Sequence, residues 1–256
     1  MDSRSIKKTS RPAADHSRRR FALAAGLSLL VMAIVAPIAQ FGVLQKLVVP
    51  TDAAATANNI VASPGLLWAA IAAFFIVAVL DVVVAWGLYG LLRPANERLA
   101  LLVASLRVIY AVAFAGALLG LFNAAQLLNG ASASAAQSEQ LSGHVATSLA
   151  SFTNGWDLVL GIFGLHLVGL GLLLARFAAP RLLAALVVVA GVGYLVDSIG
   201  SIAIADYTLK ISTFTFIGEA ILILWLLWIA IKGVRSFESP QTAVPEPVRS
   251  SEAVAS

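Results

Sequence analysis

Six long apolar segments constrain the fold of this chain more than any other feature. A helix needs about 20 mostly apolar residues to cross the hydrocarbon core of a bilayer. Six stretches of the 256-residue sequence meet that length: 21–44, 66–92, 99–128, 156–176, 181–203 and 213–232. The chain is 60% hydrophobic and only 12% charged, so lipid must cover much of its surface. We therefore predict an all-α, polytopic integral membrane protein with a six-helix transmembrane bundle over residues 21–236.

The basic residues predict the orientation of this bundle. Of the 17 Lys and Arg, all except Lys46 and Lys210 fall on the side of the two termini or in the adjacent half of a helix. Because positive charge accumulates in the cytoplasm, we expect both termini to be cytoplasmic. This placement at helix ends also argues against nucleic acid as a partner, although the isoelectric point is near 9.7.

The segments outside the spans are polar. Residues 1–20 and 237–256 have little to bury, so we expect two disordered cytoplasmic tails. A cleaved signal peptide is an alternative for the N-terminal region, but its apolar run is longer than that of a signal peptide. The loop at 129–155 is rich in Ser, Ala and Gln and lacks Lys and Arg, which favours an external loop.

Local signals refine this topology. Thr51 or Asp52 could cap a short surface helix in the loop at 45–65, and Pro37 predicts a kink in the first helix. The short connections make helices 2 and 3, 4 and 5, and 5 and 6 antiparallel neighbours. Tryptophans near the predicted membrane boundaries resemble an interfacial belt. Trp68 and Trp156 fall at the outer boundary, and Trp86, Trp225 and Trp228 toward the inner one.

Two charged residues fall inside predicted spans. Asp81 lies 12 residues before Arg93, which places it about 18 Å from the inner end of its helix. Arg107 lies about 13 Å along the next, antiparallel helix, nine residues after Arg98, so the two side chains can form a buried pair. Alternatively, the long helix 99–128 could slide until Arg107 reaches the lipid headgroups.

Helix 99–128 also carries Gly116 and Gly120 in a GxxxG spacing. This spacing permits close approach of two helix backbones, so both glycines are candidate helix-packing positions.

The stretch NGWDLVLGIFGLHLVG in the fourth span carries Asp157 and His166. Asn154 is a plausible helix cap, which would place Asp157 in the favourable first turn. For His166 we favour a neutral ring hydrogen-bonded to a neighbouring helix over a metal ligand, because no second His or Cys stands at ligand spacing.

Asp197 and Glu219 should lie at the same level on the last two helices, since both are 10 to 12 residues from the centre of their connecting loop. If the two carboxyl groups meet, they cannot both stay ionised without a cation, and one could carry a proton. In the alternative, each faces a different neighbour and the two are uncoupled.

Several stretches of this sequence match a known pattern in order. They are PTDAAATANNIVAS, LDVVVAWGLYGLLRPANERLALLVASLRVIYA, NGWDLVLGIFGLHLVGLG and AGVGYLVDS. Together they resemble the bacterial membrane protein family known as domain of unknown function 4386, over roughly residues 20–232. The resemblance implies a six-helix protein of the bacterial plasma membrane and implies no activity.

The candidate functional residues are ionisable groups inside the membrane, which are functional by default. They are Asp81, Arg107, His166, Asp197 and Glu219. The first hypothesis is a small transporter or proton-linked permease, working as a homodimer because six helices leave a narrow core. The alternative is a non-catalytic scaffold, subunit or stress-related protein whose buried charges specify helix pairing. An enzyme is disfavoured, because the chain has no cysteine and no HExxH, GxSxG, P-loop or GxGxxG motif, and we expect no cofactor and no metal.

Overall fold

The computed structural model describes residues 6–136, 138–177, 179–204 and 207–233, and within them every regular element is helical. The elements are α1 (Ile6–Pro37), the π-helix η1 (Ile38–Leu44), α2 (Gln45–Leu47), α3 (Ala53–Ala62), α4 (Pro64–Leu92), α5 (Glu97–Ala117), α6 (Leu119–Leu127), α7 (Ala133–Ala136), α8 (Glu139–Arg176), α9 (Arg181–Ala203), α10 (Ser212–Thr215) and α11 (Ile217–Lys232).

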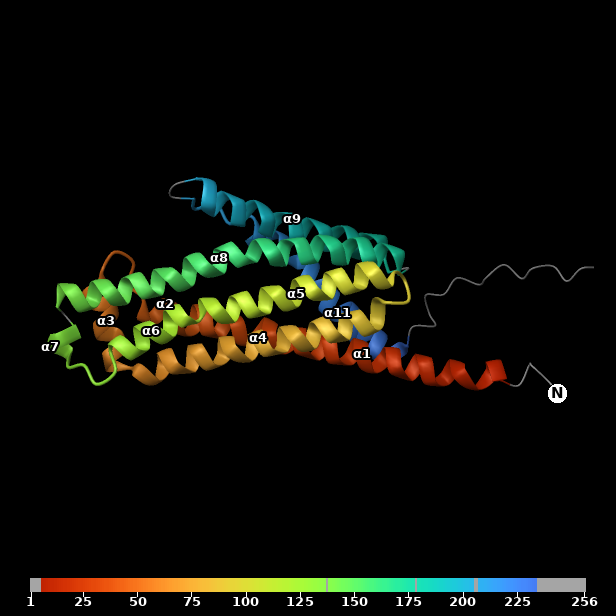
Figure 1. Cartoon of the computed structure of the whole chain (residues 1–256), viewed down its shortest axis with the longest axis horizontal. Helices are drawn as coiled ribbons and strands as arrows, with labels where there is room; N and C mark the ends of the chain where they lie inside the picture. The colour runs from red at the N-terminus through yellow and green to blue at the C-terminus, as the bar shows by residue number, and fades with distance from the viewer. Residues whose placement is uncertain (1–5, 137, 178, 205–206, 234–256) are drawn as a thin grey trace, which may run out of the picture.

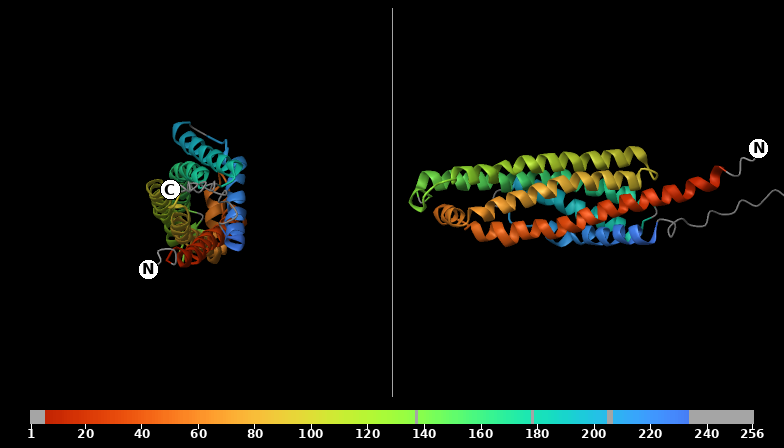
Figure 2. Two further views of the ribbon diagram at one scale, coloured as in Figure 1. Left: turned by 90° about the vertical axis from the view of Figure 1, so that its right-hand side faces the viewer. Right: turned by 90° about the horizontal axis from the view of Figure 1, so that it is seen from below.

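Six helical segments in the described part of the chain are long and apolar enough to cross a membrane, as the sequence predicted. They are His16–Leu47, Pro64–Leu92, Glu97–Leu127, Glu139–Arg176, Arg181–Ala203 and Ser212–Lys232. Figures 1 and 2 show them running along one long axis. We call the end that carries α3 and α7 the far end, because it lies opposite the N-terminus (Figure 1).

The predicted helix neighbours are confirmed. α4 contacts α5, α8 contacts α9, and α9 contacts α11, while α1 packs against both α4 and α11. α8 is the longest helix and extends through the whole bundle, and the end of α9 diverges from it (Figures 1 and 2). Because α8 contacts α3, α5, α6 and α9, it is the helix around which the others are arranged.

The N-terminal region differs from the prediction. Residues 6–20 were expected to be disordered, but they form the first turns of α1, which continues directly into the first span. Arg19 explains part of this order, because its Nε and Nη2 atoms donate hydrogen bonds to the carbonyl oxygens of Ala230 (2.9 Å) and Ile231 (2.8 Å) at the end of α11. The residues 1–5 and 237–256 of the two predicted tails lie outside the described part of the chain.

The largest difference concerns the loop expected at 129–155. α7 and the first turns of α8 occupy most of it, so the fourth span begins at Glu139. Alanine is the strongest helix former, and Val145, Leu149 and Phe152 give this polar stretch a buried apolar face. Consequently Asn154 lies inside a helix and is not a cap, and Asp157 does not lie in a first turn.

Two local signals can be compared with the structure. Asp52 is the N-cap of α3, and its Oδ1 accepts a hydrogen bond from the amide of Ala55 at 2.8 Å, as expected. At Pro37 the helix changes from α to π geometry and continues as η1. Proline lacks the amide hydrogen that an α-helical turn needs, which accounts for the change at this position.

Glycine packing is only partly as predicted. A Cβ atom on Gly120 would lie 2.6 Å from the carbonyl oxygen of Ser148, so Gly120 does bring α6 close to α8. Among the described residues, Gly116 has nothing within 4 Å of that position, so the expectation of a paired GxxxG contact is wrong. α8 and α9 also approach each other closely at Gly164 and Gly191, each of which faces the carbonyl oxygen of the other.

Candidate functional site

Arg107 and Asp81 form a buried ion pair between α5 and α4. Nη2 of Arg107 lies 2.6 Å from Oδ1 of Asp81, and the two side chains are 2% and 1% exposed. The predicted pairing is therefore confirmed. The alternative, in which Arg107 extends to the lipid headgroups, is wrong because its side chain is enclosed in the bundle. The ion pair lacks the angular geometry of a hydrogen bond, since both oxygens of Asp81 remain without a hydrogen-bond partner among the described residues.

His166 holds the other side of the same guanidinium group. Nη1 of Arg107 lies 3.2 Å from Nε2 of His166, and Nδ1 of His166 lies 2.8 Å from the carbonyl oxygen of Val103. The carbonyl can only accept and the guanidinium can only donate, so the ring must carry its hydrogen on Nδ1 and accept on Nε2. The expected neutral histidine, hydrogen-bonded to a neighbouring helix, is thus what the geometry requires. Through Arg107 the contact connects α4, α5 and α8.

Phe163 on α8 packs against this ion pair and also contacts the rings of two tyrosines. The guanidinium carbon of Arg107 lies over the Phe163 ring, 5.3 Å from its centroid, which adds a cation–π interaction. The rings of Tyr110 and Tyr194 lie 4.9 and 5.2 Å from the same ring. Because Phe163 stands three residues before His166, both side chains project from one face of α8. That spacing was the available sequence signal for Phe163.

Glu219 on α11 completes the arrangement. Its carboxyl group interacts with the side chain of Tyr194 and, electrostatically, with Arg107 and Asp81. Its Oε1 atom is buried and has no hydrogen-bond partner among the described residues. Asp81, Arg107, His166, Tyr194 and Glu219 therefore form one group contributed by α4, α5, α8, α9 and α11, which we call the polar centre.

Besides Oδ1 of Asp81, which takes part in the ion pair, three atoms of the polar centre are buried without a hydrogen-bond partner in the described part of the chain. They are Oδ2 of Asp81, Nε of Arg107 and Oε1 of Glu219. Nearly all buried polar groups in proteins have a partner, and such groups cost more in a bilayer than in water. The polar centre thus has hydrogen-bonding capacity for a proton, a water molecule or a solute.

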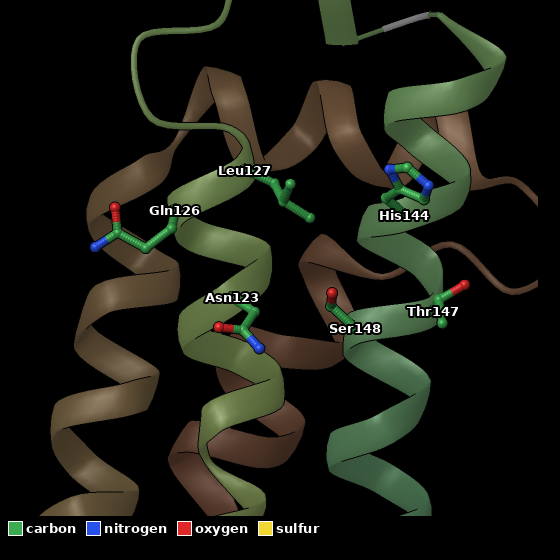
Figure 3. Close-up of a pocket in the computed structure, with 6 residues that line it drawn as sticks. All are labelled: Asn123, Gln126, Leu127, His144, Thr147 and Ser148. Carbon is green, nitrogen blue, oxygen red and sulfur yellow. The ribbon is translucent and has the colours of Figure 1, made fainter.

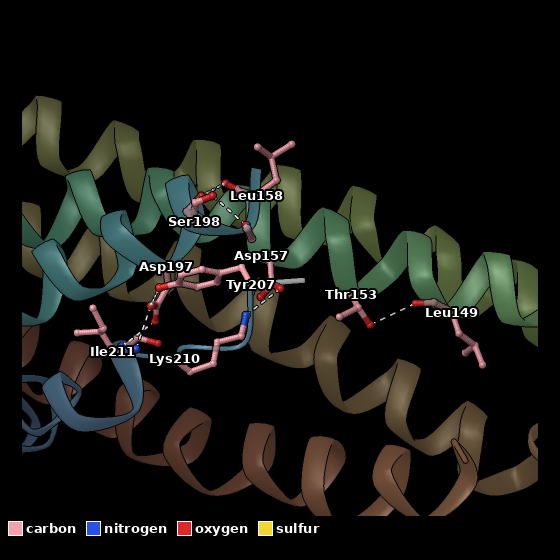
Figure 4. Close-up of polar contacts among 11 residues, drawn as sticks. Leu149, Thr153, Asp157, Leu158, Asp197, Ser198, Tyr207, Lys210 and Ile211 are labelled. Atoms are coloured by element: carbon pink, nitrogen blue, oxygen red, sulfur yellow. Dashed lines mark hydrogen bonds and ion pairs between the residues drawn. The ribbon is translucent and has the colours of Figure 1, made fainter. Parts of the chain in front are cut away.

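Asp197, the fifth predicted site residue, lies outside this group. Its carboxylate accepts hydrogen bonds from the hydroxyl of Tyr207 (2.8 Å) and from the amides of Ile211 (2.9 Å) and Ser212 (2.7 Å), as Figure 4 shows in part. It holds the segment that leads into α10. Of the two alternatives, the structure shows the uncoupled one: Asp197 and Glu219 face different neighbours, and the described contacts include no hydrogen bond between them.

Asp157 has a different role from the predicted one. It pairs with Lys210 at 2.9 Å, and their side chains are 28% and 43% exposed (Figure 4). On the same side, the hydroxyl of Ser198 donates to the carbonyl oxygen of Leu158 at 3.0 Å. These contacts attach α9 and the segment that follows it to α8.

Three cavities lie at the far end. One, of about 520 Å³, is lined by Asn123, Gln126, Leu127, His144, Thr147 and Ser148 between α6 and α8 (Figure 3). A second, of about 230 Å³, lies between α3, α4 and the end of α6. The third, of about 790 Å³, lies among η1, α2, α3 and α8. We call the third the far-end cavity; no residue of the polar centre lines any of the three.

Packed aromatic rings separate the far-end cavity from the polar centre. Phe152 lines the cavity, and its ring lies 5.5 Å from that of Trp156 and 5.6 Å from that of Phe74. Phe114 lies 5.3 Å from Trp156 and 5.9 Å from Tyr110, and Tyr110 contacts Phe163, the ring that packs against Arg107 of the polar centre. Trp156 thus packs inside the bundle and does not belong to an interfacial belt. We call Phe74, Phe114, Phe152 and Trp156 the aromatic layer.

Comparisons with known proteins agree with this architecture and assign no activity. Residues 24–230 match the family described as "Domain of unknown function (DUF4386)". A protein of Archaeoglobus fulgidus, described as an uncharacterized protein, is 30% identical over 173 residues, which cover 67% of this chain and 88% of the relative. No solved structure matches.

Proposed function

The chain belongs to the DUF4386 family, and from its geometry we propose that it is a small proton-linked permease of the plasma membrane. The observation that supports this proposal is the polar centre, a set of ionisable groups inside the bundle. Besides the ion-paired Oδ1 of Asp81, three of its buried atoms have no hydrogen-bond partner among the described residues. Ionisable groups within a membrane are costly, and they typically mark proton or substrate paths. A cluster with a structural role alone would be expected to pair these atoms.

Each residue has a role in the proposal. Glu219 accepts and releases the proton, since its buried Oε1 has no partner among the described residues. The Asp81–Arg107 pair breaks and re-forms as the bundle changes between two states, with His166 keeping the guanidinium group in place. Both termini face the cytoplasm, so the far end faces outward, and two copies form the working homodimer.

The test compares two carboxyl-to-amide variants in proteoliposomes. A potassium diffusion potential is imposed, and lumenal pH is followed with trapped pyranine. We expect proton uptake above that of protein-free liposomes, and we expect Glu219→Gln to abolish it. Asp157→Asn is the matched control, because it makes the same chemical change at a partly exposed position outside the polar centre. Equal flux in wild type and Glu219→Gln would contradict the role of Glu219.

A membrane scaffold is the second candidate, and the enclosure of the ion pair favours it. Arg107 is 1% exposed, joins three helices, and lies away from all three far-end cavities. Buried charges can fix helix register at a cost in stability. Under this function wild-type liposomes would show no flux above background, and Glu219→Gln would change only the unfolding midpoint.

A further inference from the structure

The far-end cavity has the size of a binding site for a small molecule. Its volume of about 790 Å³ is within the range of about 300–1,000 Å³ that is common for ligand pockets. Its walls come from η1, α2, α3, α6 and α8, segments far apart in the sequence. η1 is a π-helix, a geometry that is rare and frequent at functional sites.

The free polar groups of this cavity are carboxamides. Gln40, Gln45 and Asn154 line it, and no hydrogen bond joins their side chains to the described residues. Oε1 of Gln40 is moreover buried. The hydroxyl of Thr56 is already used, because it donates to the carbonyl oxygen of Asp52 at 2.9 Å and accepts from the amide of Val49. Three carboxamides, each with donors and an acceptor, suit hydroxyl and carbonyl groups of a ligand.

The charges of the lining residues narrow the class of ligand that the cavity can bind. None of the described residues that line the cavity is a Lys, Arg or His, so an anion would find no counter-charge. Asp52 is the one acidic residue of the lining, and its Oδ1 is occupied as the cap of α3. It is exposed at the N-terminal end of that helix, where the helix dipole partly neutralises a carboxylate. The lining therefore disfavours an anion and gives a cation little advantage over an uncharged group.

The remaining walls are apolar. Leu44, Val48, Leu121, Leu149 and Phe152 all line the cavity. We propose that the far-end cavity binds a small uncharged amphipathic molecule, whose hydroxyl or carbonyl groups meet Gln40, Gln45 and Asn154 and whose apolar part meets this wall. As the loading site of the permease it rests on the function proposed above, with the aromatic layer below it closing the way to the polar centre.

The absence of cysteine from the chain provides a direct test. In lipid nanodiscs, a membrane-impermeant maleimide labels one of two introduced cysteines. One is Thr153→Cys, at a residue that lines the cavity, and the other is Thr147→Cys, at an exposed residue six positions earlier on α8. Thr147 lines the neighbouring cavity of Figure 3 and serves as the control. Three probes share an octyl chain and differ in head-group charge: n-octyl glucoside, octyl sulfate and octyltrimethylammonium. Each is used below its critical micelle concentration.

We expect n-octyl glucoside to slow labelling of Thr153→Cys severalfold, to leave Thr147→Cys unchanged, and to protect better than either charged probe. Adding Gln40→Leu should remove the protection, whereas Gln126→Leu, a matched change in the neighbouring cavity, should keep it. If Thr153→Cys does not fold, Ala150→Cys, also in the lining, takes its place. Equal slowing at both positions, no slowing at all, or equal protection by octyl sulfate or octyltrimethylammonium would overturn the proposal.

Labelling requires no flux, so the two proposals can fail separately. Protection from labelling without proton uptake would support the binding site and contradict the permease function. Proton uptake without protection would support the permease function and contradict the binding site.

Discussion

Arg107 and Asp81 meet at 2.6 Å inside the bundle, and His166 contacts the same guanidinium group from the other side at 3.2 Å. One arginine thereby connects three helices that are separate in the sequence. Its charge is compensated by one carboxylate, and its orientation is fixed by a histidine whose other nitrogen bonds to the backbone of α5. The following predictions test this arrangement and its surroundings.

The two single neutralisations of the ion pair should together lower the free energy of unfolding by more than the double neutralisation does. Asp81→Asn or Arg107→Gln leaves the other charge buried and unmatched, which costs about 3 kcal/mol or more. The double variant should lose less than the sum of the singles by about 1 kcal/mol or more. Unfolding free energies in mixed micelles, measured for all four proteins, provide the comparison. Additive losses would show that the two charges do not interact.

His166 should carry its hydrogen on Nδ1. The carbonyl oxygen of Val103 requires a donor at that nitrogen, and the guanidinium group requires an acceptor at Nε2. Nitrogen NMR of histidine-labelled protein distinguishes the two neutral tautomers, and His166→Gln identifies the resonance among the three histidines of the chain. A resonance of the Nε2-protonated tautomer would be inconsistent with the geometry.

The two glycines of the GxxxG spacing should respond differently to alanine. On Gly120 the added Cβ would lie 2.6 and 2.7 Å from backbone atoms of Ser148 and Phe152, so Gly120→Ala should cost about 1–3 kcal/mol. Gly116→Ala meets open space and should be neutral or slightly stabilising, by up to about 1 kcal/mol. Thermal unfolding of the two variants side by side measures the difference. Equal losses would argue against the α6–α8 contact.

Replacing Asp197 and Asp157 by Asn should destabilise the protein to different extents, although both carboxylates accept hydrogen bonds. Asp197 is 4% exposed and uses both oxygens, so Asp197→Asn would turn an amide group toward a backbone amide and cost about 2 kcal/mol. Asp157 pairs with Lys210 where both are partly exposed, so Asp157→Asn should cost less than about 1 kcal/mol. Chemical unfolding checks both values, and a larger loss for Asp157→Asn would contradict the description of the two sites.

The sequence alone determined the class of fold. Six apolar stretches of sufficient length require six helices in a bilayer, because a backbone in hydrocarbon must satisfy its own hydrogen bonds. Short connections determined the antiparallel neighbours in the same way. Depth was also predictable, since the rise of a helix is constant, and this is why the contact of Asp81 with Arg107 could be foreseen.

Only the tertiary structure decided which side chains face each other. The rotation of a helix about its axis cannot be determined from a stretch that is apolar on all sides. The sequence therefore could not decide whether Glu219 faces the polar centre or Asp197. For the same reason the sequence did not predict the aromatic layer, or that Gly120 packs against α8 whereas Gly116 does not. The early start of α8 was missed because a polar, alanine-rich segment becomes helical where a packed partner covers one face, and that partner comes from residues distant in the chain.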